Sequence, residues 1–187
     1  MAPAEKRSKP PRAPRLRPAT FRDGAAIRAI YNDAVATLTA TFDTEPRGPS
    51  AQRRWMAEHR APYSVIVAEL DGRVIGWASL SAWSERRAYA GTAEVSEYVA
   101  APFRGQGIGR AMLARLLRDA DRRGFHTVLA RVADGNRASL RLHRAFGFRR
   151  VGVMREVGLK FGRRIDVHLL QRMAPGASGR SPDPPRR

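Results

Sequence analysis

A glycine-rich turn between a predicted strand and a predicted helix carries the clearest chemical signal in the sequence. Residues 94–112 read EVSEYVAAPFRGQGIGRAM, and Pro102 marks the end of the strand. Apolar residues then recur at helical spacing, namely Ile108, Met112, Leu113, Leu116, Leu117 and Ala120. Backbone N–H groups at a helix start have no helical acceptor, and together with the helix dipole they attract an anion. Arg104 can add a charge-assisted contact, so the stretch predicts a phosphate site.

Two common phosphate loops are excluded by residue type. A Walker A loop ends in Gly-Lys-Ser or Gly-Lys-Thr, and the chain has no such run. A dinucleotide fingerprint needs a third glycine where Arg110 stands. It also needs a buried apolar strand, whereas Glu94, Ser96 and Glu97 make this strand too polar for the centre of a parallel sheet. The pattern that remains is Arg-x-x-Gly-x-Gly over residues 104–109, with an ordinary strand-to-helix turn as the alternative.

Length and composition limit the class of protein. A chain of 187 residues with 43% hydrophobic residues predicts one domain with a real core. The absence of cysteine excludes disulfides, a cysteine nucleophile and a cysteine metal site. No apolar run approaches membrane-spanning length, and the charged N-terminus lacks the apolar core of a secretory signal. We therefore expect a soluble, cytoplasmic protein.

The net charge of +18 is spread over the tails and the body of the chain. Residues 1–17 carry six basic groups and one acid, and residues 173–187 carry three basic groups and one acid. Such a charge could attract nucleic acid, anionic lipid or a polyanionic cofactor, and it does not choose among them. Because the basic residues of the body interleave with acids and no nucleic-acid-binding signature occurs, we do not expect a nucleic-acid partner.

Periodicity and turn residues predict a mixed order of strands and helices. Thr20 and Asp23 have capping-box spacing before a helix, Ser50 is the predicted N-cap of a second helix, and Gly147 is the predicted C-cap of another. The predicted strands cover residues 15–19, 63–70, 74–80, the segment at 94, 127–133, 148–157 and 165–172. The predicted helices begin at residue 20 and cover residues 50–60, 107–124 and 136–146. The fold class is thus α/β (α+β), with a single mixed, mostly antiparallel central sheet flanked by helices, over residues 15–173. The basic segment 1–14 and the Pro/Arg-rich segment 174–187 are predicted to be disordered.

The order of elements and two motifs together resemble the GNAT N-acetyltransferase superfamily. The motifs are the loop at 104–109 and Asn136-x-x-Ser139, followed by His143 and the Phe-Gly-Phe run at 146–148. Further runs resemble the phosphinothricin acetyltransferase-like subgroup, which includes methionine sulfone and sulfoximine acetyltransferases: residues 30–32, 40–42, 83–89, 92–94, 142–143 and 156–167. The resemblance covers residues 16–173. The chain departs from the subgroup at Arg164, where Trp is usual, and at Glu97, where an apolar residue is usual.

The resemblance implies transfer of acetyl from acetyl-CoA to the α-amine of a small amino-acid-like acceptor, usually by a homodimer and without a metal. It places the cofactor along the predicted strand, the turn and the following helix. The implied cofactor-binding residues are Glu97, Tyr98, Val99, Arg104, Gly105, Gln106, Gly107, Ile108, Gly109, Arg110, Asn136 and Ser139. A protein N-terminal or lysine acetyltransferase is the second enzyme hypothesis, and a basic nucleic-acid-binding protein is the non-enzymatic one.

Acetyl transfer requires that the ammonium lose a proton and that the thiolate gain one. Glu94 is the candidate base, with a solvent-facing or ion-paired carboxylate as the alternative. His143 is the candidate acid, where many GNAT enzymes have Tyr, with packing beside Phe146 as the alternative. Asn136 can serve the pantetheine arm, the helix N-cap or both. Since no cysteine can carry the acetyl group, we expect direct transfer.

Arg86 is the candidate clamp for a substrate carboxylate, because a guanidinium binds a carboxylate through two hydrogen bonds. Phe42 and Tyr89 are expected to form walls of the acceptor pocket. A surface arginine and core aromatic residues are the alternatives for these three positions. Trp55 and Trp77 are assigned to the core.

Overall fold

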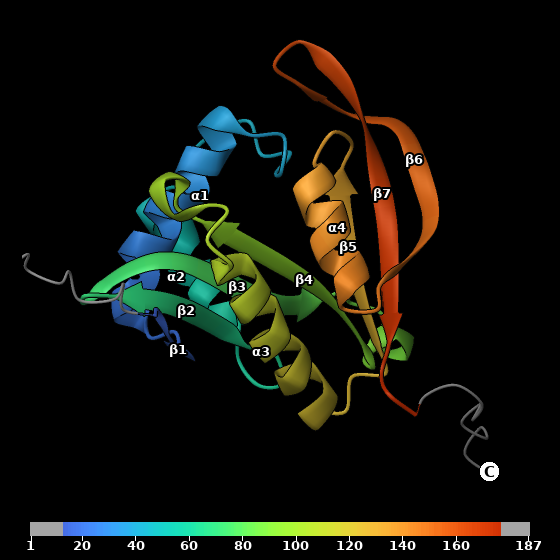
Figure 1. Ribbon diagram of the computed structural model, residues 1–187, viewed down its shortest axis with the longest axis horizontal. Helices are drawn as coiled ribbons and strands as arrows, with labels where there is room; N and C mark the ends of the chain where they lie inside the picture. Colours follow the sequence, from blue (N-terminus) through green and yellow to red (C-terminus); the bar gives the residue numbers. More distant parts are fainter. Residues whose placement is uncertain (1–12, 177–187) are drawn as a thin grey trace, which may run out of the picture.

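The computed structural model describes residues 13–176, and nearly all of the two predicted tails lies outside this range. One seven-stranded sheet runs in the order β1-β2-β3-β4-β5-β7-β6 (Figure 1). Its strands are β1 Arg15–Pro18, β2 Val65–Leu70, β3 Arg73–Ala82, β4 Thr92–Val99, β5 Thr127–Ala133, β6 Arg149–Lys160 and β7 Arg163–Met173. All neighbouring strands are antiparallel except β4 and β5, so the predicted mixed, mostly antiparallel sheet is confirmed.

Helices cover both faces of this sheet (Figure 1). They are α1 Gly24–Thr37, α2 Pro49–Glu58, α3 Ile108–Arg122 and α4 Arg137–Ala145, with short 3-10 turns η1 Phe21–Asp23, η2 Arg87–Tyr89 and η3 Ala101–Phe103. α1 and α2 pack against Val67 and Trp77 on one face. On the other face α3 buries the apolar stripe expected from its sequence. Fully burying one such leucine or methionine contributes about 1.5–3 kcal/mol.

The ends of the first two helices follow from their capping residues. The capping box of Thr20 and Asp23 is formed as predicted. Arg17 donates to both carboxylate oxygens of Asp23 at 2.8 Å, and this pairing lowers the pKa of Asp23 to about 2. The predicted N-cap at Ser50 is wrong, since α2 begins at Pro49 with Gly48 as its N-cap. Proline favours the first helical position because that residue needs no backbone N–H, which displaces the start by one residue.

β4 and β5 are paired at one end and separate at the other. The parallel register joins Thr92–Glu94 to Thr127–Leu129 and ends there. Beyond Glu94, β4 remains paired with β3, while β5 remains paired with β7. Figure 1 shows the two strands diverging from this point. The edge of β4 that faces β5 is therefore open over its second half.

No helix in residues 13–176 is long and apolar enough to cross a membrane.

Candidate active site

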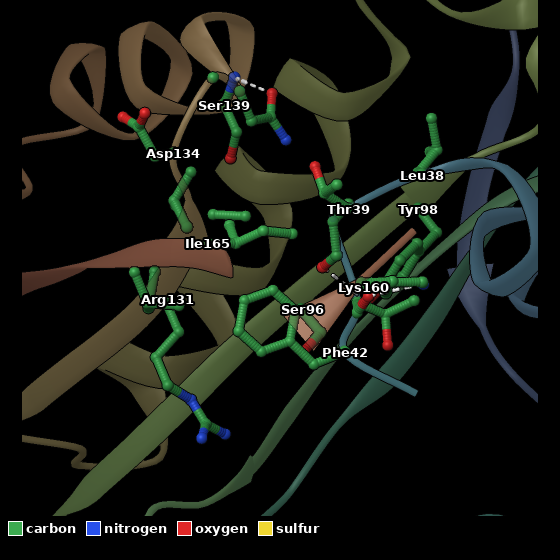
Figure 2. A pocket seen from close by; sticks show the side chains of 18 of the residues that line it. Leu38, Thr39, Phe42, Ser96, Tyr98, Arg131, Asp134, Ser139, Lys160 and Ile165 are labelled. Carbon is green, nitrogen blue, oxygen red and sulfur yellow. Dashed lines mark hydrogen bonds between the residues drawn. The ribbon is translucent and has the colours of Figure 1, made fainter. Parts of the chain in front are cut away.

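A cavity of about 1390 Å³ occupies the gap between the diverging strands. It is lined by residues of β4, β5, α4, β6, β7 and the loop that follows α1. Figure 2 looks into it, with Arg131 and Ser139 on the β5 and α4 side and Tyr98 and Lys160 on the opposite side. The cavity brings together Phe42, Glu94, Glu97, Tyr98, Val99, Arg104, Gly109, Asn136, Ser139 and His143 from the predicted site.

The turn before α3 has the geometry of an anion site. Gly105 and Gly107 have φ of +77° and +81°, which residues with a Cβ rarely adopt. The first helical bond is donated by Ala111 to the carbonyl of Gly107, at 3.0 Å. The amides of residues 108–110 thus lie at a helix N-terminus without a helical acceptor, which suits a pyrophosphate.

The other predicted residues of the turn lie close to this N-terminus. Gly105, Gln106 and Gly107 form the turn, and Ile108 and Arg110 lie in the first turn of α3. None of these five residues lines the cavity, whereas Arg104 and Gly109 do. The Arg104 side chain donates to the Val99 carbonyl at 3.0 Å and to Asp33 at 2.9 Å. The Arg110 guanidinium lies 5.1 Å from the centre of the Phe146 ring. Both arginines therefore contact protein groups near the start of α3.

α4 turns three predicted residues toward the cavity. Asn136 caps the helix, its side-chain oxygen accepting from the Ser139 amide at 3.1 Å. His143 is 2% exposed, and its Nδ1 lies 2.9 Å from the Ser139 carbonyl. The C-cap of α4 is Phe146, one residue before the predicted Gly147, which follows it with φ +83° and donates to the Arg144 carbonyl at 3.1 Å. The hydrogen bonds at both ends of α4 fix the helix, and with it the position of His143 in the cavity wall.

Glu94 stands where β4 and β5 begin to separate. Both of its carboxylate oxygens accept from Arg131 of β5, each at 2.6 Å. Arg131 also lies 5.6 Å from the centre of the Trp83 ring. The ion-paired alternative foreseen for Glu94 is thus present, and the carboxylate still lines the cavity.

The loop after α1 and the β6–β7 hairpin close the cavity on the side away from α4. Phe42 packs on Gly158, where an added Cβ would lie 2.1 Å from the ring. Lys160 is 4% exposed and donates to the Thr41 carbonyl at 2.8 Å. Burial lowers the pKa of Lys160, and the nearby Asp43 opposes that effect. Phe42 therefore lies on a wall of the cavity, as expected, beside a buried amine that the sequence analysis did not select.

Two predicted acceptor residues stand apart from this cavity. Arg86 and Tyr89 are exposed at η2, before the end of β4 that is paired with β5, and neither lines the cavity. The cavity is lined instead by the basic residues Arg104, Arg131, Lys160, Arg163 and Arg164. Arg163 and Arg164 are exposed at the start of β7.

Comparison with known proteins gives the family. Residues 27–148 match the acetyltransferase (GNAT) family. The chain is a member of that family. It is 39% identical over 158 residues to the L-methionine sulfoximine/L-methionine sulfone acetyltransferase of Pseudomonas paraeruginosa, covering 83% of this chain and 92% of that protein.

Two solved structures extend the comparison of this acetyltransferase. A GNAT superfamily phosphinothricin acetyltransferase from Sinorhizobium meliloti, in complex with AcCoA, has a TM-score of 0.86 at 32% identity, covering 92% and 95% of the two chains. A ribosomal-protein-alanine N-acetyltransferase from Brucella melitensis has a TM-score of 0.82 at 38% identity, covering 84% and 98%. The predicted fold and enzyme class are confirmed.

Sequence reasoning did not select Arg131, Lys160 or Arg163, which line the acetyltransferase cavity. Arg131 could have been found from register, because parallel pairing of Glu94 with Leu129 places residue 131 on the same side of the sheet. Lys160 lies in the run 156–167 that resembles the subgroup, but its burial could not be predicted, since it depends on the loop at Thr41, which is far away in the sequence. No group of three or more His, Asp or Glu side chains in residues 13–176 is placed to hold a metal ion.

Proposed function

We propose that this enzyme transfers acetyl from acetyl-CoA directly to the α-amine of a small amino acid of the phosphinothricin, methionine sulfone or methionine sulfoximine type. The observation that carries the proposal is the position of Glu94, a carboxylate at the fork of β4 and β5 and on the wall of one cavity. The relatives named for methionine sulfoximine and for phosphinothricin support the acceptor class. The AcCoA complex of the Sinorhizobium meliloti acetyltransferase supports acetyl-CoA as the acetyl donor.

Acetyl-CoA would be held by backbone groups and a few side chains. The amides of residues 108–110 would bind its pyrophosphate, with Arg104 and Arg110 adding positive charge at the turn. The open edge of β4, from Glu97 to Val99, would pair with the amide groups of the pantetheine arm. The side-chain oxygen of Asn136 accepts the capping hydrogen bond of α4, and its side-chain amide nitrogen could donate to the pantetheine arm.

The chemistry of this cavity needs two proton transfers. Glu94, directly or through water, would take the proton that leaves the acceptor nitrogen, which frees the lone pair for attack on the thioester carbon. A β4 amide would stabilise the negative charge on the thioester oxygen. As the C–S bond breaks, the sulfur keeps the electron pair and His143 would supply its proton. The products are the N-acetyl amino acid and free coenzyme A.

The acceptor carboxylate needs a cation. The sequence proposal was Arg86, which is exposed and outside the cavity, whereas Arg163 and Arg164 line the cavity and are exposed. Single substitutions Arg86→Ala, Arg163→Ala and Arg164→Ala separate the three positions. The one that holds the carboxylate raises KM for the acceptor while leaving KM for acetyl-CoA unchanged.

The function is tested by coenzyme A release with a panel of free amino acids and short peptides. We expect release with methionine sulfone, methionine sulfoximine or phosphinothricin, and loss of release when the acceptor α-amine is blocked. Release with alanine-terminated peptides alone would reject the amino-acid proposal. That result would favour the second candidate, a protein N-terminal acetyltransferase, which the likeness to a ribosomal-protein-alanine N-acetyltransferase supports.

A homodimer and a cytoplasmic location belong to the same proposal. β6 is an edge strand whose hairpin exposes large apolar side chains: Val151, Met154, Val157, Leu159 and Phe161. Met154, Val157 and Phe161 also line the cavity, whereas Val151 and Leu159 do not, and large apolar side chains exposed along an edge strand favour an interaction surface. Light scattering after gel filtration should give twice the chain mass, and Leu159→Arg should halve it.

A further inference from the structure

Glu97 and His143 face each other inside the proposed acetyl-CoA cleft. Glu97 projects from β4 with 12% of its side chain exposed, and His143 projects from α4 with 2% exposed. Oε1 of Glu97 lies 3.8 Å from Nε2 of His143. No hydrogen-bond partner of that buried nitrogen is present in the described residues. A shift of about 1 Å would bring the two atoms to hydrogen-bond distance.

The other ring nitrogen determines what Nε2 can do. Nδ1 of His143 lies 2.9 Å from the Ser139 carbonyl, which can only accept a hydrogen bond. The Ser139 hydroxyl, 3.2 Å from Nδ1, can donate or accept, and the shorter contact with the carbonyl favours a hydrogen on Nδ1. In the neutral ring Nε2 then presents a lone pair to Glu97. A lone pair and a carboxylate facing each other repel unless a proton lies between them. One proton, on either atom, converts the contact into a hydrogen bond.

The surroundings favour retention of that proton. Burial raises the pKa of Glu97, and the charge of His143 opposes this effect. Tyr98, the neighbour of Glu97 on the same strand, has a pKa that is raised mainly by burial. The side chains of Arg104 and Arg131, which also line the cavity, are committed to Asp33 and Glu94 respectively.

We propose that Glu97 is a positioning residue that holds a proton jointly with His143 and supplies it, through the imidazole, to the sulfur that leaves acetyl-CoA. The inference rests on the proposed function. When the C–S bond breaks, the sulfur takes the proton, which leaves a neutral imidazole and a Glu97 carboxylate. Water then returns a proton to the pair. This role would explain why the chain has Glu97 at a position where the subgroup usually has an apolar residue.

Kinetics against pH test this role. In Glu97→Gln, which keeps the shape, we expect kcat near pH 7 to fall about 10²-fold, the lower range for a general acid–base contribution. KM for both substrates should change less than about twofold, since an interaction made only in the transition state is lost. The alkaline limb of the kcat profile should move or disappear. Glu97→Asp should recover part of the rate. The exposed Glu85, which does not line the cavity, gives the matched control Glu85→Gln.

A measurement without turnover separates this inference from the proposed function. Carboxyl ¹³C NMR should give Glu97 a pKa above that of an ordinary glutamate, and His143→Gln should raise it further because a neighbouring positive charge is lost. A Glu97 pKa that is ordinary, or unchanged in His143→Gln, would overturn the pair. An unchanged kcat profile in Glu97→Gln would overturn its role in turnover. If no amino acid were acetylated, the proposed function would fail while the NMR result still decided the pair.

Discussion

Arg131 of β5 donates two hydrogen bonds of 2.6 Å to the carboxylate of Glu94 of β4, at the point where the two strands separate. The pair ties the proposed base to the opposite wall of the cleft. It fixes the direction of the carboxylate, and it also occupies lone pairs that a base must use. Glu94 must therefore act through a remaining lone pair, through water, or after Arg131 shifts.

The first prediction concerns Glu94 itself. Glu94→Gln keeps the shape and removes the basicity, so kcat near pH 7 should fall on the order of 10²-fold or more. The loss should shrink as pH rises, because an α-amine with a pKa of roughly 8 then supplies its own lone pair. Coenzyme A release from pH 6 to 9.5 checks this. Full turnover at pH 7 would assign proton removal to water or to His143.

The second prediction separates positioning from chemistry in the same pair. Arg131→Ala leaves Glu94 able to ionise but removes the two hydrogen bonds that orient its carboxylate. We expect kcat to fall about 10-fold, as when a catalytic group loses its orientation. Combined with Glu94→Gln, it should add little further loss, because residues that act as a unit are not additive. Additive losses in the double variant would show that Arg131 acts apart from Glu94.

The third prediction uses two glycines at opposite ends of α3. Gly107 and Gly124 have φ of +81° and +80°, and neither has an atom within 4 Å of an added Cβ. Replacement by valine strains both turns by about 1–2 kcal/mol. Only Gly107→Val also disturbs the backbone amides of the proposed pyrophosphate site. The affinity of this variant for acetyl-CoA should therefore fall about 10-fold, which corresponds to about 1.4 kcal/mol of binding free energy. Isothermal titration compares the two variants, and equal affinities would reject the site.

The sequence predicted those parts of the molecule that depend on local signals. β5 has the predicted limits, and the stripe on α3 is buried as its spacing indicated. Contacts that depend on how distant segments meet were not predictable in the same way. Arg131 reaches Glu94 through strand register, and Lys160 is buried by Thr41. Arg86 was chosen for its chemistry, and the fold then placed its loop outside the cavity.

The fourth prediction concerns the wall formed by Phe42. A Cβ on Gly158 would lie 2.1 Å from the Phe42 ring, whereas one on Gly152 of the same strand would have nothing within 4 Å. Gly158→Ala must therefore displace the ring and should cost about 1–3 kcal/mol of stability, as overpacking does. KM for the acceptor should rise, with KM for acetyl-CoA unchanged. Gly152→Ala is the control, and equal kinetics in both variants would remove Phe42 from the acceptor site.

The last prediction follows from the pKa of Glu97, which burial raises in the folded chain. An acid whose folded pKa lies above its unfolded value of about 4.3 favours folding below that pH and loses this contribution as pH rises through the folded pKa. At pH 8 the buried acid therefore lowers stability relative to an apolar residue. Glu97→Val should raise Tm at pH 8 by about 2–4 °C for each kcal/mol gained, and by less at pH 4.5.

Differential scanning calorimetry at the two pH values provides the check, with Glu85→Val as the exposed control. A stabilised variant with reduced turnover would show that the enzyme keeps an unfavourable buried acid for its chemistry. A gain of the same size at both pH values would mean that packing, and not ionisation of Glu97, sets the stability difference. A fall in Tm at pH 8 would contradict the raised pKa, because the paired carboxylate would then stabilise the fold.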